Sequence, residues 1–591
     1  DIENKRAVIL KDGDLNRAIR ASSTYPFYVR ATEYKDQLLF DGGLYNNFPV
    51  DVAIAEFNPK VLLGCNVSYN YEAPEIDDLL SQVKNMLVSK TDYTLQGMPG
   101  IIVEPENDIT TFDFERFPEA IASGYETTLS RMDSIKVLIN QQDSLQTASK
   151  RKAFNTRKVP YKIARLSFKK LNKNQESYLR KGIVKKQNQP YLADLRSNFL
   201  SLKEDPFIRY LYPDLKYNAA DSNYTMDVDV DLEKSIVISF GGNVSNKAIN
   251  TGFVSADWVH LGRFGTILSA NTYFGKYYSS FKLDAKLYFE GKTPWVLNPY
   301  VVFNRWDYFK SRTSFFEDIQ PAFVIENERF GGLSISLPEN HSGKFVLDIR
   351  AFSNKPNYYL TRDFSNADTA DQSLFQGGRI AFSWLQSTLD QKQYPSKGHK
   401  TSASISMVQG LESYIPGSTS EAPAFSNELK SWIQFRAAYQ EFFEILPRLS
   451  TYPMAEIRLA SFYTFSNFRS TKIFQPQYNP LTESPTLYLP RYRALNYGGL
   501  GLGFNYELSD RFSIRTQHHM FQPVNELEEG FRDQTTLGSL LADRFYIGSF
   551  AAVFQSPIGP LALNLNYYDK SSEPWSFMIN FGYILFNNRS L

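Results

Sequence analysis

Two stretches near the end of the chain read LALNLNY (residues 561–567) and FMINFGYIL (residues 577–585). In both, large apolar side chains occupy every second position, and mostly small or polar residues lie between them. This strict alternation predicts β-strands that have one apolar face and one more polar face. A strand of about ten residues is long enough to cross a membrane at a tilt.

The same alternation recurs toward the N-terminus as far as about residue 235. It predicts sixteen strands, which start near residues 235, 249, 263, 278, 296, 331, 344, 374, 399, 428, 449, 499, 512, 545, 560 and 576. An even number allows an antiparallel barrel to close without a free edge, as hydrocarbon requires. The sequence therefore predicts a 16-stranded antiparallel transmembrane β-barrel over residues 234–591.

The composition fits this barrel and excludes several other classes. Aromatic residues make up 15% of the chain, which excludes disorder, and no run approaches 18 apolar residues, which excludes a transmembrane helix. The net charge of +1 argues against nucleic acid as a partner. The only cysteine, Cys65, cannot form an intrachain disulfide or a thiolate metal cluster, and we predict no cofactor and no metal. The alternative, a large soluble all-β domain, is disfavoured by the many outward-facing aromatics.

The gaps between the predicted strands set the orientation of the barrel. Gaps after even-numbered strands are mostly short, whereas those after odd-numbered strands are mostly long, at about 305–330, 355–373, 411–427, 467–498 and 522–544. Bacterial outer-membrane barrels keep short turns on the periplasmic side and long loops outside. We therefore expect a protein of the outer membrane whose residues before about 235 are periplasmic.

The loop at 467–498 contains Arg491-Tyr492-Arg493-Ala494-Leu495 and precedes the last five strands. This arrangement resembles the BamA-like surface-antigen barrels, in which the corresponding loop folds into the lumen and carries an Arg-Gly-aromatic motif. The resemblance implies a lumen position for Arg493, with Arg491 as the competing candidate. Ala494 and Leu495 depart from the usual glycine and aromatic residue. An ordinary exposed loop arginine is the other interpretation.

Residues 160–233 have the order strand, helix, helix, strands, and lead directly into the barrel. In order, length and position this segment is similar to a POTRA domain, the periplasmic module that precedes BamA-like barrels. Its last strand alternates apolar residues with Asp227, Asp229, Asp231 and Glu233. A calcium site is the alternative for these acids, but an extended strand does not make carboxylates converge as Ca²⁺ requires.

Fourteen Lys or Arg residues lie between residues 150 and 186, with Glu176 as the only acid. The first of them belong to a predicted linker, residues 150–159. A solvated linker and helix face is one interpretation, and attraction to anionic lipids of the membrane is the other. The candidate membrane-facing residues are Lys150, Arg151, Lys152, Arg157 and Lys158.

Residues 1–149 have α/β character, with a helix at Leu15–Ala21, a buried strand at Leu38–Phe40, a helix from Val50 and a near-continuous apolar strand at Val61–Val67. The strand at Leu38–Phe40 ends at Asp41-Gly42-Gly43, and Arg20-Ala-Ser-Ser-Thr-Tyr-Pro precedes it. In combination these motifs resemble the C-terminal half of patatin-like phospholipases.

The resemblance implies a Ser–Asp dyad in which Asp41 activates a serine, flanked by Gly42 and Gly43. The five histidines all fall in the predicted barrel, which agrees with a dyad rather than a triad. The chain contains no Gly-x-Ser-x-Gly motif, where the family carries its nucleophile, and no glycine-rich oxyanion loop before Asp41. We therefore expect the chain to be the C-terminal portion of a longer polypeptide, and to be inactive alone.

The sequence thus predicts three parts: a partial α/β patatin-like domain, a small α/β POTRA-like domain and the barrel. The leading hypothesis is a lipid acyl hydrolase (phospholipase or esterase) anchored in the outer membrane, acting on phospholipid or another acyl ester. The alternative is a BamA-like assembly or translocation component with a degenerate hydrolase domain. The resemblance also implies that such fusions can be homodimers.

Overall fold

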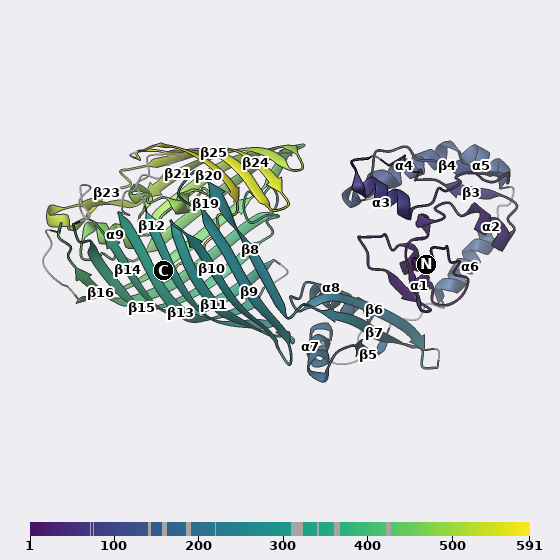
Figure 1. Cartoon of the computed structure of the whole chain (residues 1–591), viewed down its shortest axis with the longest axis horizontal. Helices are drawn as coiled ribbons and strands as arrows, with labels where there is room; N and C mark the ends of the chain where they lie inside the picture. Colours follow the sequence, from purple (N-terminus) through teal and green to yellow (C-terminus); the bar gives the residue numbers. More distant parts are fainter. Residues whose placement is uncertain are drawn as a thin grey trace. The chain divides into compact units, whose positions relative to one another are not determined.

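The computed structural model describes the whole chain except residues 71, 75, 111, 140–143, 157–161, 185–190, 219, 309–322, 340–341, 360–366, 421–426 and 572. The chain divides into two compact units, Asp1–Lys158 (unit 1) and Val159–Leu591 (unit 2) (Figure 1).

Unit 1 is built from short helices and two separate two-stranded sheets. Strands β1 and β2 are antiparallel, whereas β3 and β4 are parallel. Its elements are α1 (Leu15–Ser22), β1 (Thr32–Tyr34), β2 (Gln37–Leu39), η1 (Gly42–Leu44), α2 (Val50–Phe57), β3 (Leu62–Cys65), α3 (Leu79–Leu87), β4 (Gly100–Val103), η2 (Phe114–Arg116), α4 (Phe117–Ser130), α5 (Met132–Leu138) and α6 (Ser144–Thr156).

The strands of unit 1 are less buried than the sequence predicted. Residues Leu62–Cys65 of the apolar run 61–67 form a parallel strand, β3, which pairs with β4, but Leu63 on its face is 56% exposed. Likewise Leu39 is buried while Leu38, next to it on β2, is exposed. The expectation of buried strands was wrong for one face of each, since no layer among the described residues covers that face.

Unit 2 begins with a small α/β module. It consists of β5 (Ile163–Lys169), α7 (Lys173–Ile183), α8 (Leu192–Lys203), β6 (Ile208–Asn218) and β7 (Asn223–Leu232). The sheet order is β5-β7-β6, with β5 parallel and β6 antiparallel to β7. A capping box of Asn172 and Gln175 starts α7. The apolar face of β7 packs on Tyr178, Leu179 and Ile183 of α7.

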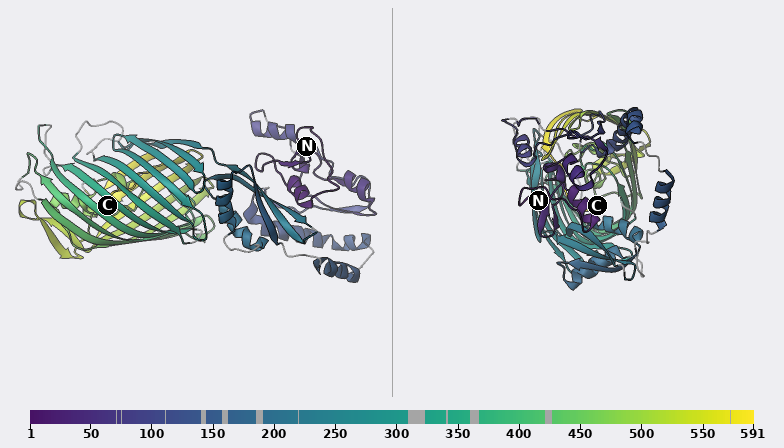
Figure 2. Two further views of the ribbon diagram at one scale, coloured as in Figure 1. Left: turned by 90° about the horizontal axis from the view of Figure 1, so that it is seen from below. Right: turned by 90° about the vertical axis from the view of Figure 1, so that its right-hand side faces the viewer.

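The remainder of unit 2 contains a closed antiparallel barrel (Figures 1 and 2). Strand β18 continues β17 after a break, and both pair with β19, so the described wall has sixteen strands as predicted. The wall segments are β8 (Ile236–Ser245), β9 (Thr251–Leu261), β10 (Gly265–Gly275), β11 (Tyr278–Phe289), β12 (Trp295–Tyr308), β13 (Val324–Pro338), β14 (Gly343–Tyr358), β15 (Asp371–Ser387), β16 (His399–Ile415), β17 (Asn427–Glu441), β18 (Phe443–Leu446), β19 (Leu449–Ala460), β20 (Tyr497–Ser509), β21 (Phe512–Pro523), β24 (Phe545–Ser556), β25 (Gly559–Tyr568) and β26 (Trp575–Gly582).

The alternation read from the sequence is the alternation of outward and inward side chains. Along β25, Leu561, Leu563 and Leu565 are exposed on the outer surface, while Ala562 and Asn564 are buried inside. An apolar outer face on a closed barrel is the arrangement that a lipid bilayer requires, and the strand number is typical of outer-membrane proteins.

No described helix is long and apolar enough to cross a membrane.

Strands β12 and β13 are longer than the sequence predicted, at the expense of the loop between them. The gap expected at 305–330 is shorter, because β12 extends to Tyr308 and β13 begins at Val324. Two acids, Glu326 and Glu328, interrupt the apolar pattern of β13, yet both are buried on its inner face. The additional residues at the start of β13 therefore place two charged side chains in the lumen.

The barrel closes at a short seam between its first and last strands. Strand β26 pairs with β8 through three residue pairs, whereas it pairs with β25 through seven. Gly242 and Gly582 meet at the seam with φ of +144° and +94°. A Cβ on Gly582 would lie 2.2 Å from the carbonyl oxygen of Gly242, so this close approach requires glycine.

Candidate functional site

Asp41 lies just after β2, in a turn held from both sides. Its backbone N–H donates to the carbonyl oxygen of Thr24 at 2.9 Å, and its Oδ1 accepts the N–H of Gly43 at 2.9 Å. The Arg20 side chain steadies the preceding segment by donating to Thr24 Oγ1 and to the Arg30 carbonyl. The motifs that suggested the resemblance thus come together around one carboxylate.

The two glycines after Asp41 have different surroundings. A Cβ on Gly43 would lie 2.6 Å from Asn47 Oδ1 and 3.3 Å from Asp41 Oδ1, so a side chain there would disturb the turn. A Cβ on Gly42 would meet nothing within 4 Å. Within unit 1 the packing therefore accounts for Gly43 and not for Gly42.

Asp41 lines a pocket of about 540 Å³ inside unit 1. Its apolar lining includes Val8, Leu10, Ile19 and Val52. A carboxylate that lines a partly apolar pocket is suited to general-base chemistry on a substrate with an apolar group.

A second group able to act with Asp41 is not found among the histidines. His260, His399, His518 and His519 lie on barrel strands β9, β16 and β21, and His341 lies outside the described residues. The role of Asp41 as the acid of a dyad therefore stays a prediction, and the sequence contains no Gly-x-Ser-x-Gly motif to accompany it.

The predicted membrane-facing basic residues fall at the end of unit 1. Lys150, Arg151 and Lys152 are exposed on α6, whereas Arg157 and Lys158 lie outside the described residues. Their interaction with anionic lipid stays a prediction.

The acidic ladder on β7 is paired with basic groups along the extended strand. Lys216 Nζ lies 2.9 Å from Asp227, and Lys170 Nζ lies 3.2 Å from Asp229 and 3.8 Å from Asp231. Hydrogen bonds from Ser167 and Lys216 lower the pKa of Asp227. Among the described residues no group of three or more His, Cys, Asp or Glu side chains is placed to hold a metal ion.

The loop between β19 and β20, residues 461–496, folds into the barrel and contains α9 (Phe468–Phe474). Asn467 at the start of α9 donates to Tyr358 Oη on β14 at 2.8 Å. Glu483 accepts hydrogen bonds from Asn566 and Ser576 on β25 and β26. These contacts join the loop to opposite parts of the wall.

Arg493, like Lys472, is a basic residue that this loop buries in the lumen. Its side chain is 4% exposed and donates to the carbonyl oxygens of Ile473 at 2.6 Å and Gln475 at 3.2 Å. The guanidinium lies over the ring of Tyr488 and 3.6 Å from Glu326 Oε1. The competing candidate, Arg491, is exposed.

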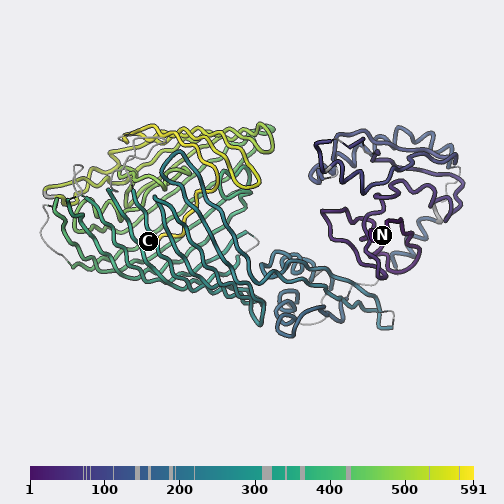
Figure 3. Tube along the Cα trace, in the orientation of Figure 1, coloured from purple at the N-terminus to yellow at the C-terminus, as the bar shows by residue number. Residues whose placement is uncertain are grey.

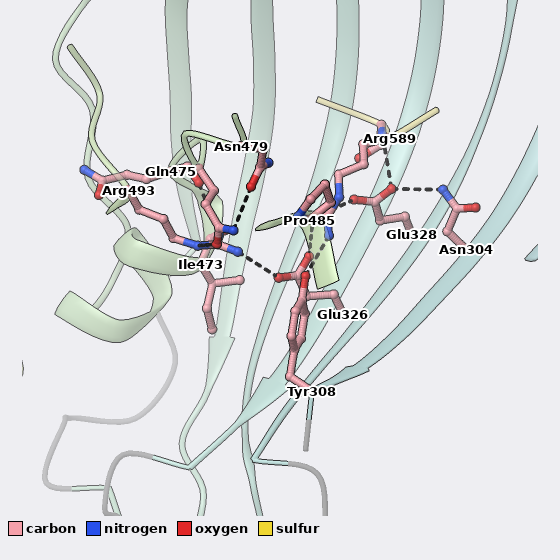
Figure 4. Close-up of polar contacts among 12 residues, drawn as sticks. Asn304, Tyr308, Glu326, Glu328, Ile473, Gln475, Asn479, Pro485, Arg493 and Arg589 are labelled. Carbon is pink, nitrogen blue, oxygen red and sulfur yellow. Dashed lines mark hydrogen bonds and ion pairs between the residues drawn. The ribbon is translucent and has the colours of Figure 1, made fainter. Parts of the chain in front are cut away.

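Glu326 has a second partner that sequence reasoning missed. Arg589 Nη1 lies 2.5 Å from Glu326 Oε2, so this carboxylate stands between Arg493 and Arg589 (Figure 4). The Arg589 side chain also lies 3.9 Å from Glu328, donates to Tyr308 Oη at 2.9 Å and lies over the Trp306 ring. The only sequence signal was a pair of acids at alternate positions where a loop was expected.

Residues 3–54 match the family model described as patatin-like phospholipase. The matched segment includes the Asp41 turn and most of the pocket lining. No curated protein matches the chain significantly.

The structure is similar to solved outer-membrane barrels. BamA from Haemophilus ducreyi lacking POTRA domains 1–3 is 11% identical, with 72% of this chain and 85% of that chain covered and a TM-score of 0.48. CdiB from Acinetobacter baumannii is 12% identical, with 72% and 74% covered and a TM-score of 0.43. CdiB from Escherichia coli is 8% identical, with 72% and 77% covered and a TM-score of 0.41.

Proposed function

We propose that unit 1 is the aspartate-bearing part of a patatin-type lipid acyl hydrolase that the barrel anchors in the outer membrane. The observation that carries this proposal is the patatin-like match at residues 3–54 together with the Asp41 turn and its pocket. The substrate is a phospholipid or another acyl ester. The short-turn end of the barrel, where β8 begins, would place residues before 235 in the periplasm.

In this proposal Asp41 accepts the proton of a serine as the serine attacks the ester carbonyl. The Gly43 N–H fixes one carboxylate oxygen at 2.9 Å and so orients the other for this role. The serine and the oxyanion donors come from polypeptide outside these 591 residues, since no Gly-x-Ser-x-Gly motif lies within them.

The decisive experiment changes Asp41 to Asn in the protein that carries the serine motif. Asparagine keeps the size of the side chain but cannot act as a base, so esterase turnover should fall by about 10²–10⁴-fold or more. The matched control, Asp36→Asn in the turn between β1 and β2, should retain activity. The 591-residue chain by itself should hydrolyse no acyl ester. Turnover by the Asp41→Asn protein would refute the dyad assignment.

A BamA-like assembly or translocation role is the second candidate, and the seam favours it. Only three residue pairs join β26 to β8, which would make this the easiest place for the wall to part. Loss of this chain in cells would then lower the amounts of other outer-membrane proteins. Unchanged amounts, together with Asp41-dependent esterase activity, would leave the hydrolase as the function.

A further inference from the structure

The residues after the last wall strand run into the lumen. After Gly582 the chain leaves β26, and the end of the chain lies within the outline of the barrel both across and along its axis (Figures 1 and 2). The trace in Figure 3 follows the same course. We refer to residues 586–591 as the tail.

We propose that the tail is an internal latch, which keeps loop 461–496 inserted and the lumen closed by sharing the carboxylate of Glu326 with that loop. The inference goes beyond the hydrolase activity, because it assigns the barrel a closed state that is stabilised by the ion pairs of Glu326.

The tail is bound to the wall along its length. Asn587 donates through Nδ2 to Asn271 Oδ1 at 2.9 Å and to Ser280 Oγ at 2.8 Å, and its backbone N–H donates to Tyr278 Oη. Further hydrogen bonds join Asn304 Nδ2 to the Asn588 carbonyl at 2.9 Å, Glu328 to the Ser590 N–H at 3.1 Å, and Arg350 Nη1 to the Arg589 carbonyl at 2.9 Å. The tail thus spans strands β10 to β14.

The tail meets the inserted loop at Glu326. Arg493 closes the end of α9 through its bonds to the Ile473 and Gln475 carbonyls, and it approaches Glu326 from the loop side. Arg589 approaches the same carboxylate from the tail side. A single acid therefore holds both segments, and a change at one of them alters the ion pairing of the other.

Arg493, Glu326 and Arg589 line an internal cavity of about 250 Å³. The charges of these three side chains face the cavity. If Arg589 is removed, the Glu326 carboxylate loses one of its two arginine partners in a confined space, where water screens its charge poorly. Loss of Arg589 should therefore weaken both the tail and the loop rather than only one side chain.

The segment that leads to the tail is also bound by a turn at the end of the barrel opposite to loop 461–496. Residues 388–398, between β15 and β16, place Tyr394 against Ala551, Val553 and Ala562 inside the barrel. Gln393 Oε1 in this turn accepts the N–H of Ile584 at 3.1 Å. The tail is accordingly connected to segments that enter the lumen from each end.

The test measures ion conductance of the purified full chain in planar lipid bilayers. The wild type should be mostly closed. Arg589→Ala should raise the open probability by about tenfold or more, as expected when a half-buried arginine is removed from a buried carboxylate, Glu326. Arg589→Lys should keep most of the closure. Arg305→Ala is the matched control, because Arg305 lies on β12 and its ion pair and hydrogen bonds within the described residues go to Asp307, at 2.8 Å, rather than to the tail. Equal opening by both alanine variants, or no opening by Arg589→Ala, would overturn the proposal.

A second measurement keeps the proposal testable if Arg589→Ala fails to assemble. Cysteines at Ser280 and Asn587, in a chain carrying Cys65→Ser, should be joined by a short bis-methanethiosulfonate reagent, because the ends of the native side chains, Ser280 Oγ and Asn587 Nδ2, lie 2.8 Å apart. In the Arg589→Ala background this cross-link should restore closure, and reduction should abolish it. A cysteine pair that this reagent does not join in the folded barrel would show that the tail does not occupy the lumen, and the latch would be refuted.

Discussion

The lumen of the barrel and the surface of unit 1 differ in how far their side chains find partners within the chain. In the lumen, Phe375 and Trp432 are almost completely buried, and the loop and the tail fill the space beside them. In unit 1, large apolar side chains such as Leu15, Phe57 and Phe117 remain exposed. The comparison teaches that this chain supplies the stability of the barrel from its own residues, whereas the described part of unit 1 leaves apolar faces uncovered.

The largest effect is expected inside the lumen. Phe375→Ala would remove the ring that contacts Phe352, Phe465 and Trp432, and should lower the free energy of unfolding by about 3–5 kcal/mol. Phe382→Ala on the outer face of the same strand should cost less, because lipid fills the space. Urea unfolding in lipid vesicles measures both. Equal losses would show that the lumen is not the source of stability.

The next effect concerns the basic face of α6. Replacing Lys150, Arg151 and Lys152 by Glu should remove attraction to an anionic membrane worth about 1 kcal/mol for each basic residue near the surface. Hydrogen exchange of α6 in anionic and neutral nanodiscs measures this attraction in the full chain. The control reverses three other exposed lysines of unit 1, Lys5, Lys60 and Lys90. The solvated-linker interpretation predicts no difference between the two lipids.

A smaller effect is expected at the Asp41 turn. Gly43→Ala should destabilise the turn by about 1–3 kcal/mol, because the new Cβ would press on Asn47 Oδ1. Gly42→Ala offers a matched control in open space. Faster hydrogen exchange of amides 41–47 in the first variant alone is the expected result. The same protection in both variants would contradict the packing of this turn.

The smallest effect is a pH dependence in the α/β module. Hydrogen bonds from Ser167 and Lys216 lower the pKa of Asp227 from its ordinary value of 3.8. A lowered acid pKa stabilises the fold above that value, and this stability is lost as the pH falls through the folded pKa. Hydrogen exchange of β5 and β7 should therefore accelerate below about pH 4, less so in Asp227→Asn than in the control Asp221→Asn. Identical pH profiles for the two variants would show that Asp227 does not cause the pH dependence.

The sequence predicted the barrel well because period two is a local signal. Most strands begin within about four residues of the predicted starts, since each carries its own alternation. The exception, β13, begins seven residues early because Glu326 and Glu328 look like loop residues until a lumen is present to receive them.

The candidate sites also differ in whether a local sequence signal could reveal them. Asp41, Gly42 and Gly43 form one contiguous motif, so local sequence could place them after a strand. The partner of Arg493 could not be found in this way, because Glu326 and Arg493 lie on separate elements that only barrel closure brings together. Arg589 was missed for the same reason, since a residue beyond the last strand has no periodicity to reveal its position.

The lumen tail also has a consequence for the order of assembly. The hydrogen bond between Asn304 and the Asn588 carbonyl joins residues 284 positions apart, and that between Arg589 and Glu326 joins residues 263 positions apart. Contacts between such distant residues form slowly, because the intervening chain must first be ordered. Residues synthesised after all of the wall strands thus complete a site on strands made much earlier. Assembly of this barrel should end with a slow phase, in which the tail enters a wall that has already formed.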